Sequence, residues 1–479
     1  MSRSIDVLII GGGPGGYIAA LRLAQLGRSA LVVEREQLGG ECLNRGCIPS
    51  KSLIHASQLY EELQRTGAEI GVRPESVRLD IPAMQQWKEE VLSKERNGVA
   101  MLFKSMGVEW IHGTARLTGP RSATVEAQKG EGGPQNLEFQ ACILATGAYH
   151  LSLPGIEPDG ARVLTAREML TLRSVPARLV ILGGGVSGVE LGQHYARLGS
   201  KVTIVELLPQ IVPGTEADLA RELRKALEQA GVEIWTGSKA TRLEKTDSQV
   251  VLHAETPQGP RDFPGDVLFL TVGKRPETRN LGLESAGVHL TERGGFIQVD
   301  DRMATNVPGI FAVGDVARPP MLAHKAYREG ILAAEVIAGL PSRWNHQVIP
   351  GVIYTAPELA SVGLTLEAAR EKGIAAREVR FPYLALGRAH ASHATQGFVK
   401  MVAEEGTGLV LGLHAAGERS GEFVSEAALA IEMGATVRDI AATIHPHPTF
   451  GELMSETALL WLGEPMHVAR PSHRERPRP

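Results

Sequence analysis

The pattern that most constrains the fold is a strand, a glycine-rich loop, a helix and a second strand ending in glutamate, and it occurs twice. The first copy runs from a continuous apolar strand through Gly11, Gly13 and Gly16 to Glu34. The second copy occupies residues 178–206 with the same glycine spacing. A short apolar run before such a loop indicates a buried parallel strand. The sequence therefore predicts an α/β chain with two Rossmann-like dinucleotide-binding domains.

Each position of the first loop has its own steric role. Gly11 allows the tight turn, Gly13 lets a pyrophosphate approach the backbone, and Gly16 lets the helix pack closely on the strand. Glu34 is placed to accept hydrogen bonds from a ribose. The corresponding residues of the second copy are Gly183, Gly185, Gly188 and Glu206.

Glu206 bears on the choice between the two pyridine nucleotides. A carboxylate at this point bonds the 2′-hydroxyl of NAD and repels the 2′-phosphate of NADP. The stretch LLPQIVPG that follows offers no Arg to receive a phosphate. The second copy is therefore predicted to bind NAD; the alternative is a vestigial nucleotide fold that binds nothing.

Cys42 and Cys47 lie shortly after the first loop. In an ideal helix, Cα atoms five residues apart are separated by ~8.6 Å, which exceeds the ~7 Å limit for a disulfide. A bridge therefore requires a turn or a distorted helix start, for which Gly46 supplies the freedom. Pro49 fits the first turn of the next helix, and Cys47 then lies near its N-terminus, where the dipole favours a thiolate. Such thiols suggest a redox-active disulfide beside a flavin; two reduced thiols in a loop are the alternative.

The amino-acid composition limits the cellular locations and the classes of partner that fit this chemistry. Three cysteines in 479 residues argue against a disulfide-stapled secreted framework and favour a reducing, cytoplasmic location. No secretory signal is expected before the first strand, and no apolar run reaches the ~18 residues of a membrane span. The net charge of −4 gives no indication of a nucleic-acid partner.

The length predicts about three domains. From about residue 346 the pattern changes to short alternating strands with helices, which indicates a separate α+β domain. The family resemblance described below implies divisions at 1–150 and 275–345 for the FAD-binding domain, 151–274 for the NAD-binding domain, 346–467 for a dimerisation domain and 468–479 for a disordered tail.

Two further residues stand on apolar strands. Cys142, within CILATG, is predicted to be a buried, inert thiol. Asp315 follows the apolar run GIFAV, where its carboxylate is placed to bind a ribityl hydroxyl; a second role as a helix N-cap is compatible with this contact.

From Ile5 to about His467, the chain resembles the flavin-dependent pyridine nucleotide–disulfide oxidoreductases. The motifs that carry this resemblance are GGECLNRGCIPSK, GGGVSGVELG, FAVGDVA, LAHKA, EAALAIEMGA and HPHPTFGE. Val186, LAHKA and EAALAIE favour the lipoamide branch of the family over glutathione reductases. No cysteine follows Cys142, which separates the chain from mercuric reductases.

The sequence departs from the family pattern at several positions. Glu41 and Arg45 stand where Thr or Val and another apolar residue are commoner, Pro446 replaces a frequent Ala, and Gly451 replaces a frequent Ser or His. Arg45 either lowers the pKa of a nearby thiol or faces solvent. These departures bear on substrate preference more than on the chemistry.

The resemblance implies a catalytic sequence. Two electrons pass from a protein-bound dihydrolipoamide through the Cys42–Cys47 disulfide and FAD to NAD⁺, with Cys42 as interchange thiol and Cys47 on the flavin side. His447, oriented by Glu452, is the implied base rather than His445. In the family this base reaches across a twofold interface, so a homodimer with shared active sites is implied.

The resemblance also implies the cofactor contacts. Lys51 and Glu190 are expected to meet beside the flavin. FAD contacts are expected from Gly11, Gly13, Pro14, Gly15, Gly16, Glu34, Gly40, Lys51, Ala115, Thr146, Gly147, Asp315, Met321, Leu322, Ala323 and His324. NAD contacts are expected from Gly183, Gly185, Val186, Gly188, Glu190, Glu206, Ala240 and Gly273.

The implied partner is the lipoyl-bearing protein of a 2-oxo acid dehydrogenase or glycine cleavage complex; no metal, nucleic-acid or membrane partner is expected. One alternative is a related NAD(P)H-dependent reductase of a small disulfide or a metal ion. A second alternative is a flavoprotein redox sensor or structural partner without turnover, which is hard to reconcile with the complete set of catalytic residues.

Overall fold

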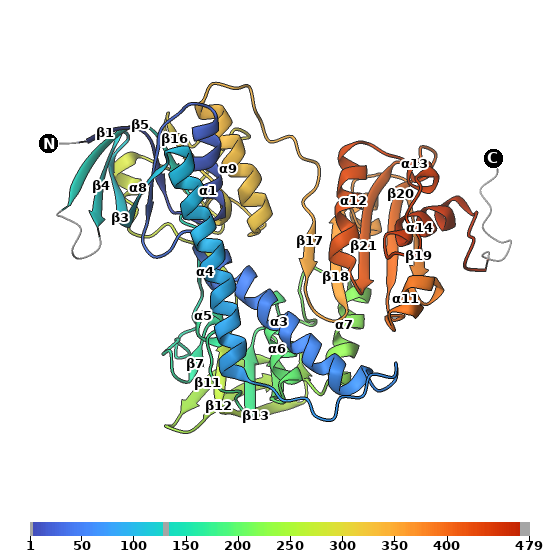
Figure 1. Cartoon of the computed structure of the whole chain (residues 1–479). Coiled ribbons are helices and arrows are strands. Elements are labelled where there is room, and N and C mark those ends of the chain that lie inside the picture. Colours follow the sequence, from blue (N-terminus) through green and yellow to red (C-terminus); the bar gives the residue numbers. More distant parts are fainter. Residues whose placement is uncertain (1–2, 128–133, 470–479) are drawn as a thin grey trace. The chain divides into compact units, whose positions relative to one another are not determined.

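The structure is a computed structural model that describes residues 3–127 and 134–469. The chain divides into two compact units, and each unit is drawn from two stretches of sequence (Figure 1). Unit 1 comprises Met1–Pro176 and Val267–Asn345; unit 2 comprises Ala177–Asp266 and His346–Pro479. The domain boundaries expected from the sequence divide the chain more finely and stay a prediction. Most of the predicted tail, from residue 470 on, lies outside the described residues.

Unit 1 is built on a six-stranded sheet. Its strands are β1 (Arg3–Ile10), β2 (Ala30–Glu34), β3 (Glu109–Gly119), β4 (Ser122–Ala127), β5 (Gln135–Leu144) and β16 (Ile310–Ala312). β1 runs parallel to β2 and to β5, and β16 adds to β5 in parallel although some 170 residues of chain separate them. Val7, Leu8 and Ile9 are fully buried, as expected for a strand covered on both faces. The first predicted buried strand is confirmed.

Two helices pack against each other beside this sheet. α1 (Pro14–Gln25) follows the glycine loop, and α9 (Ala323–Ile337) comes from the far end of the unit (Figure 1). A Cβ atom on Gly330 of α9 would lie 2.3 Å from the carbonyl oxygen of Gly15 in α1, so the two backbones are in close contact. A Cβ on Gly16 would lie 1.9 Å from the carbonyl oxygen of Gly11, which confirms the close packing expected there.

The segment between β2 and β3 is mostly helical, with a break in its middle. It consists of α2 (Gly40–Arg45), α3 (Cys47–Glu61), a short π-helix η1 (Glu62–Thr66) and α4 (Ile81–Met106). Asp80 caps α4 by accepting a hydrogen bond from the Ala83 amide at 2.9 Å, and Gly107 ends it with φ 70°. The polar stretch before Asp80 thus separates two helices.

The remaining elements of unit 1 are short. They are β6 (Ala148–His150), β7 (Val163–Leu164), α5 (Ala166–Met169), β14 (Val267–Leu270), β15 (Lys274–Pro276), α8 (Leu283–Ala286) and the 3₁₀ turn η2 (Gly314–Val316). β6 and β15 form an antiparallel pair in which Lys274 lies opposite His150.

The first half of unit 2 contains the second glycine loop. Its elements are β8 (Arg178–Leu182), α6 (Val186–Arg197), β9 (Lys201–Val205), α7 (Ala217–Gln229), β10 (Glu233–Trp235), β11 (Lys239–Lys245), β12 (Val250–Thr256) and β13 (Gly259–Gly265). β8, β9 and β10 pair in parallel, and β11 to β13 form an antiparallel sheet.

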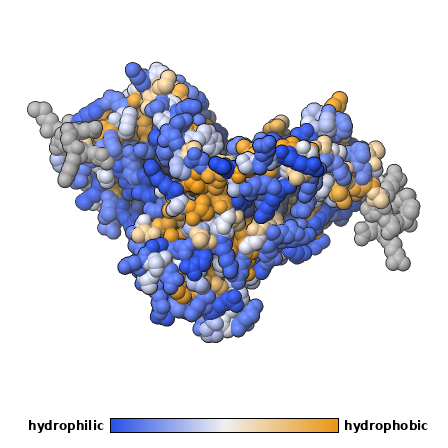
Figure 2. Space-filling view, turned by 60° about the horizontal axis from the view of Figure 1, so that its bottom comes forward, coloured by the Kyte–Doolittle hydropathy of each residue, from blue (hydrophilic) through white to orange (hydrophobic). Residues whose placement is uncertain are grey.

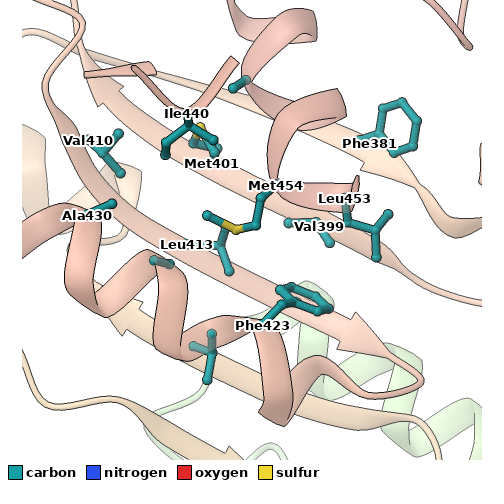
Figure 3. Packing of buried hydrophobic residues seen from close by; sticks show 14 of the residues in the cluster. Phe381, Val399, Met401, Val410, Leu413, Phe423, Ala430, Ile440, Leu453 and Met454 are labelled. Atoms are coloured by element: carbon teal, nitrogen blue, oxygen red, sulfur yellow. The ribbon is translucent and has the colours of Figure 1, made fainter. Parts of the chain in front are cut away.

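The second half of unit 2 is an antiparallel sheet with helices, as predicted from about residue 346. Its elements are β17 (Gly351–Ile353), β18 (Glu358–Gly363), α10 (Leu366–Glu371), β19 (Ala376–Pro382), η3 (Tyr383–Ala385), α11 (Gly387–Ala391), β20 (Phe398–Glu404), β21 (Val410–Gly417), α12 (Ser420–Glu432), α13 (Val437–Ala442) and α14 (Glu452–Leu462). The sheet order is β17-β18-β21-β20-β19. Figure 3 shows Met401 and Leu413 of this sheet packed with Phe423 of α12 and Met454 of α14.

Polar residues cover most of the face seen in Figure 2, with apolar patches among them. Within residues 3–127 and 134–469, none of the helices has both the length and the apolar character needed to cross a membrane.

Candidate active site

A cavity of about 680 Å³ lies within unit 1. This volume falls in the range of ~300–1,000 Å³ typical of ligand sites. The cavity wall includes the glycine loop, the end of β2, both cysteines of the pair and the turn after β16. Twelve of the predicted FAD contacts line it, namely Gly11, Gly13, Pro14, Gly15, Glu34, Gly40, Ala115, Thr146, Gly147, Asp315, Met321 and Ala323. The wall does not include Gly16, Lys51, Leu322 or His324.

The glycine loop has the backbone that an anion site needs. Gly11 has φ +105°, and a Cβ there would lie 2.3 Å from the Ala145 carbonyl oxygen, so only glycine fits. The N-cap of α1 is Gly13, which has no side chain to bond the first amides of the helix. Those amides and the positive end of the helix dipole face an anion that approaches the loop.

The two predicted ribose-binding glutamates have the same surroundings. Glu34 accepts hydrogen bonds from the amides of Gly12 (2.7 Å) and Glu36 (2.8 Å). Glu206 accepts from the amides of Gly184 (2.6 Å) and Leu208 (2.7 Å). Burial raises the pKa of Glu34, against the lowering effect of the Gly12 amide. Each carboxylate oxygen has a second lone pair, which a ribose hydroxyl can use.

Cys42 and Cys47 form a disulfide with Cα atoms 4.8 Å apart. The helix between them is interrupted, because α2 ends at Arg45 and Gly46 adopts φ −136° and ψ −106° before α3 begins. The expected break in the helix is confirmed. So is the position of Pro49 in the first turn of α3.

Cys47 is the first residue of α3, a helix of 15 residues with no acidic side chain in its first turn. The positive end of the helix dipole therefore favours a thiolate at this sulfur once the bridge is reduced. Cys142 is different: it is fully buried in β5, and burial alone raises the pKa of its thiol far above the ordinary range. The predicted inert role of Cys142 agrees with this environment.

Arg45 forms an ion pair on the cavity wall, and its expected effect on a thiol stays a prediction. Its guanidinium forms an ion pair with Glu36, and Arg167 binds the same carboxylate at 3.1 Å. All three residues line the cavity. Arg45 therefore shares one carboxylate with Arg167, and this group of charges has a positive excess.

A second charged group on the cavity wall surrounds Glu41. Lys274 donates to the Glu41 carboxylate at 2.5 Å, and Nε2 of His150 lies 3.1 Å from the same oxygen. Burial of Glu41 acts to raise its pKa, but the hydrogen bond from His150 and the charge of Lys274 outweigh it and lower the pKa to about 2. Sequence reasoning did not identify Lys274 or His150.

Asp315 lies in the 3₁₀ turn η2, after β16, and lines the cavity. Burial raises its pKa, while the charges of Lys274 and Lys325 oppose this. The second role as a helix N-cap is wrong, because the N-cap of the following helix α9 is Leu322. The predicted contact with a ribityl hydroxyl stays a prediction.

His447 and Glu452 meet at the start of α14 in unit 2. Nδ1 of His447 lies 2.8 Å from the Glu452 carboxylate, whose other oxygen accepts from the Thr449 amide at 2.8 Å. The His447 side chain is 76% exposed, whereas that of His445 is 7% exposed and bonded to Glu426 at 2.9 Å. Of the two histidines, only His447 presents a ring nitrogen to an incoming group.

The remaining predicted residues are divided between the units. Glu190 is 4% exposed on α6 and accepts from the Tyr354 amide at 2.9 Å, and Val186 begins the same helix. Gly183, Gly185, Gly188 and Ala240 are also in unit 2, whereas Lys51 and Gly273 are in unit 1. The pairing of Lys51 with Glu190 and the approach of His447 to the cysteines stay predictions.

Side chains of the kind that bind metals do not gather anywhere in the described part of the chain: no group of three or more His, Cys, Asp or Glu could hold an ion.

Comparison with known proteins places this site in a family. The pattern of the family described as pyridine nucleotide-disulphide oxidoreductase matches residues 5–330, and that of its dimerisation domain matches residues 349–458. The chain belongs to the pyridine nucleotide-disulphide oxidoreductase family. The resemblance seen in the sequence, the mixed α/β fold class and the oxidoreductase class of enzyme are confirmed.

Relatives of this family cover nearly the whole chain. A protein named dihydrolipoyl dehydrogenase from Thermus scotoductus is 44% identical over 97% of this chain and 99% of its own length. One of the same name from Geobacillus stearothermophilus is 42% identical over 97% of each chain. The crystal structure of LpdA from Mycobacterium tuberculosis matches with a TM-score of 0.87 and 29% identity, covering 95% of this chain and 99% of that one.

Proposed function

We propose that this chain is a dihydrolipoyl dehydrogenase, which reoxidises protein-bound dihydrolipoyl groups and passes the electrons through FAD to NAD⁺. The observation that carries the proposal is the Cys42–Cys47 disulfide in the wall of a cavity of dinucleotide size. The relatives from Thermus scotoductus and Geobacillus stearothermophilus, which bear this name, support it at 42–44% identity.

The cavity wall fits FAD. The glycine loop and the N-terminus of α1 suit the pyrophosphate, Glu34 suits the adenosine ribose, and Asp315 suits a ribityl hydroxyl. A methyl group in place of the Gly11 hydrogen would collide with backbone, which is typical of a loop shaped for close approach. Bound in this cavity, FAD would supply the redox chemistry that connects the reduced cysteines with NAD⁺.

The second loop fits NAD. Glu206 is 7% exposed and held by two backbone amides, so its carboxylate is fixed where a ribose 2′-hydroxyl would bind. A 2′-phosphate would meet this carboxylate as a like charge. Gly185 caps α6 without a side chain, as Gly13 caps α1.

The cysteines perform the exchange with the substrate. A dihydrolipoyl thiolate attacks Cys42, the S–S bond breaks, and Cys47 leaves as a thiolate. The second dihydrolipoyl sulfur then displaces Cys42 and closes the lipoyl disulfide. The position of Cys47 at the N-terminus of α3 favours its departure, because a thiol of lower pKa is the better leaving group.

His447 accepts the proton of the attacking thiol. Because the Glu452 carboxylate is an acceptor, Nδ1 of His447 carries the hydrogen and Nε2 is the basic nitrogen. The charge of Glu452 also stabilises the imidazolium that forms. The Thr449 amide holds the carboxylate in this orientation.

The functional protein is a homodimer in this proposal, with His447 of one subunit serving the cysteines of the other. The family's dimerisation domain supports the dimer. Exposed apolar side chains of the same domain also support it, since Leu429 is 62%, Met433 74% and Ile444 96% exposed. The proposed partner is a lipoyl-bearing protein of a 2-oxo acid dehydrogenase or glycine cleavage complex, and the proposed location is the cytoplasm.

The proposal is tested by steady-state turnover of the purified, FAD-loaded protein. Dihydrolipoamide and NAD⁺ should yield NADH, and Cys42→Ser should abolish this reaction because the interchange sulfur is missing. Turnover of NADPH with an oxidised thiol, and none with dihydrolipoamide, would overturn the proposal in favour of a disulfide reductase.

A further inference from the structure

The cavity beside the disulfide contains an ion pair that sequence reasoning did not foresee. Glu41 immediately precedes Cys42 on α2, and both residues line the cavity. Glu41 is also a departure from the family, in which an uncharged residue is commoner at this position. A negative charge next to the interchange cysteine needs a physical explanation, because a carboxylate disfavours a thiolate nearby.

The neighbours of Glu41 supply that explanation. Lys274 and His150 lie directly opposite each other on β15 and β6, so their side chains share one face of this two-stranded ribbon. Both reach the same oxygen of Glu41, Lys274 at 2.5 Å and His150 at 3.1 Å. The ribbon register is fixed by the bond from the Leu151 amide to the Gly273 carbonyl, at 3.0 Å.

The pair is only partly shielded from the cavity. The side chains of Glu41 and Lys274 are each 31% exposed, and that of His150 is 23% exposed. Asp315 is a further acid that responds to the charges of both Lys274 and Glu41. The other charge on α2, Arg45, is paired with Glu36, a carboxylate that it shares with Arg167. Glu41 adjoins Cys42 in the chain and Lys274 binds the Glu41 carboxylate, so this pair of opposed charges lies on the cavity wall next to the disulfide.

We infer that Glu41 and Lys274 are positioning residues that set the redox equilibrium of the Cys42–Cys47 disulfide as an opposed pair of charges. This inference rests on the proposed disulfide oxidoreduction at these cysteines. Lys274 favours the reduced, negatively charged form, and Glu41 limits that effect, so that the bridge can both accept electrons from a dithiol and release them.

The sign of each effect follows from the balanced half-reaction. The disulfide takes up two electrons and one proton and becomes one thiol and one thiolate. The reduced site thus carries one more negative charge than the oxidised site. Removal of the Glu41 charge leaves Lys274 uncompensated and stabilises the thiolate, whereas removal of the Lys274 charge leaves Glu41 uncompensated and destabilises it.

The test measures this equilibrium without turnover. The FAD-loaded protein is equilibrated with mixtures of reduced and oxidised dithiothreitol at one fixed pH, free thiols are alkylated, and mass spectrometry counts them. Glu41→Gln should move the equilibrium toward the dithiol by at least about threefold, and Lys274→Gln toward the disulfide by a similar factor, as expected for one unit charge in a partly solvated site. A tenfold change corresponds to about 30 mV for this two-electron couple.

The double variant provides the sharpest comparison. Glu41→Gln combined with Lys274→Gln should return to within about twofold of the parent, because the two charge effects cancel. The inference would be overturned if both single variants shift the disulfide equilibrium in the same direction, or if neither shifts it. Loss of packing alone would not shift the equilibrium in opposite directions in the two variants. If Lys274→Gln does not retain flavin, the comparison of Glu41→Asp with Glu41→Gln decides. Glu41→Asp keeps the negative charge and must keep the parent disulfide equilibrium, whereas Glu41→Gln must shift it.

A matched control uses an ion pair of the same unit away from the cavity. Arg3 and Glu109 are 2.7 Å apart with side chains 45% and 63% exposed. Glu109→Gln should leave the disulfide equilibrium unchanged. Turnover and the disulfide equilibrium test the two proposals separately. If the protein does not oxidise dihydrolipoamide but the single variants shift the equilibrium in opposite directions, the inference holds and the proposed function fails. If the protein turns over normally and these shifts are absent, the inference fails.

Discussion

Substitution of Gly13 by alanine is expected to weaken cofactor binding without changing the stability of the apoprotein. Its φ of −74° and ψ of −173° suit any L-residue, and a Cβ there would have its nearest neighbour, the Cα of Gly40, at 3.7 Å. The protein itself therefore has room for Gly13→Ala. The added methyl would stand on the cavity wall, between the loop backbone and an approaching pyrophosphate.

The expected loss is one hydrogen bond to a charged group. Such a bond contributes ~1.5–3 kcal/mol, and each 1.4 kcal/mol is a factor of ten in affinity, so the Kd for FAD should rise roughly ten- to a hundredfold. The apoprotein should melt at the parent temperature. The FAD-bound protein should melt lower, because ligand stabilisation falls with affinity.

Gly16→Ala should behave in the opposite way. Its Cβ would lie 1.9 Å from the Gly11 carbonyl oxygen, and an ordinary contact of 3.4 Å requires a displacement of 3.4 − 1.9 = 1.5 Å. Close packing against α9, through Gly15 and Gly330, blocks a simple shift of α1. The apoprotein of Gly16→Ala should therefore be destabilised by roughly 1–3 kcal/mol or more.

Fluorescence titration of FAD into apoprotein and thermal unfolding with and without FAD measure both effects. Gly98→Ala serves as the control, because Gly98 lies inside α4 with nothing within 4 Å of its Cβ position. It should stabilise the fold by roughly 0.5–1 kcal/mol and leave FAD affinity unchanged. Equal destabilisation of the apoprotein by Gly13→Ala and Gly16→Ala would refute the steric argument.

Three further predictions concern single residues. Cys47→Ser should bind FAD but lose the long-wavelength thiolate-to-flavin absorbance after reduction; a band that persists would assign the flavin contact to Cys42. His447→Ala should slow flavin reduction by dihydrolipoamide in stopped-flow mixing by roughly 10²–10⁴-fold, with reduction by NADH unchanged, and equal slowing of both would argue against the role as base. Burial raises the pKa of Glu358 from 4.5 to about 7. The folded state therefore favours the protonated acid, and stability is full below about pH 4.5 and lost as the pH rises through about 7. Above about pH 8, the free energy of unfolding of Glu358→Gln, measured by urea titration, should exceed that of the parent by up to about 3 kcal/mol. An increase in this free energy that is the same at all pH values would contradict the prediction.

The sequence was informative where the chemistry is local. The glycine loops, the glutamates that end the following strands and the interruption at Gly46 each depend on spacing within a few residues, and each is present as expected. The orientation of His447 by Glu452 is local in the same sense. Over a few residues the backbone can adopt few conformations, so the sequence pattern alone was sufficient to predict these local structures.

The charges around Glu41 were missed because they depend on distant strands. His150 and Lys274 lie more than 100 and 200 residues beyond Glu41, on strands of three residues each. Strands this short have too few residues to show a period of two. The ion pairs of Glu36 with Arg45 and Arg167 could not be foreseen either, because Arg167 is more than 100 residues away in the sequence.

The pairing of β16 with β5 also has a consequence for biosynthesis. The residues that line the cavity extend from Ile10 to Ala326, so the ribosome must synthesise more than two-thirds of the 479 residues before the cavity can close. Translation from the N-terminus produces the first glycine loop and β5 early. The strand β16, which pairs with β5, follows only after all of residues 177–266. Binding of the proposed flavin is therefore expected only late in synthesis, and a chain released early would have the glycine loop without the rest of the cavity wall.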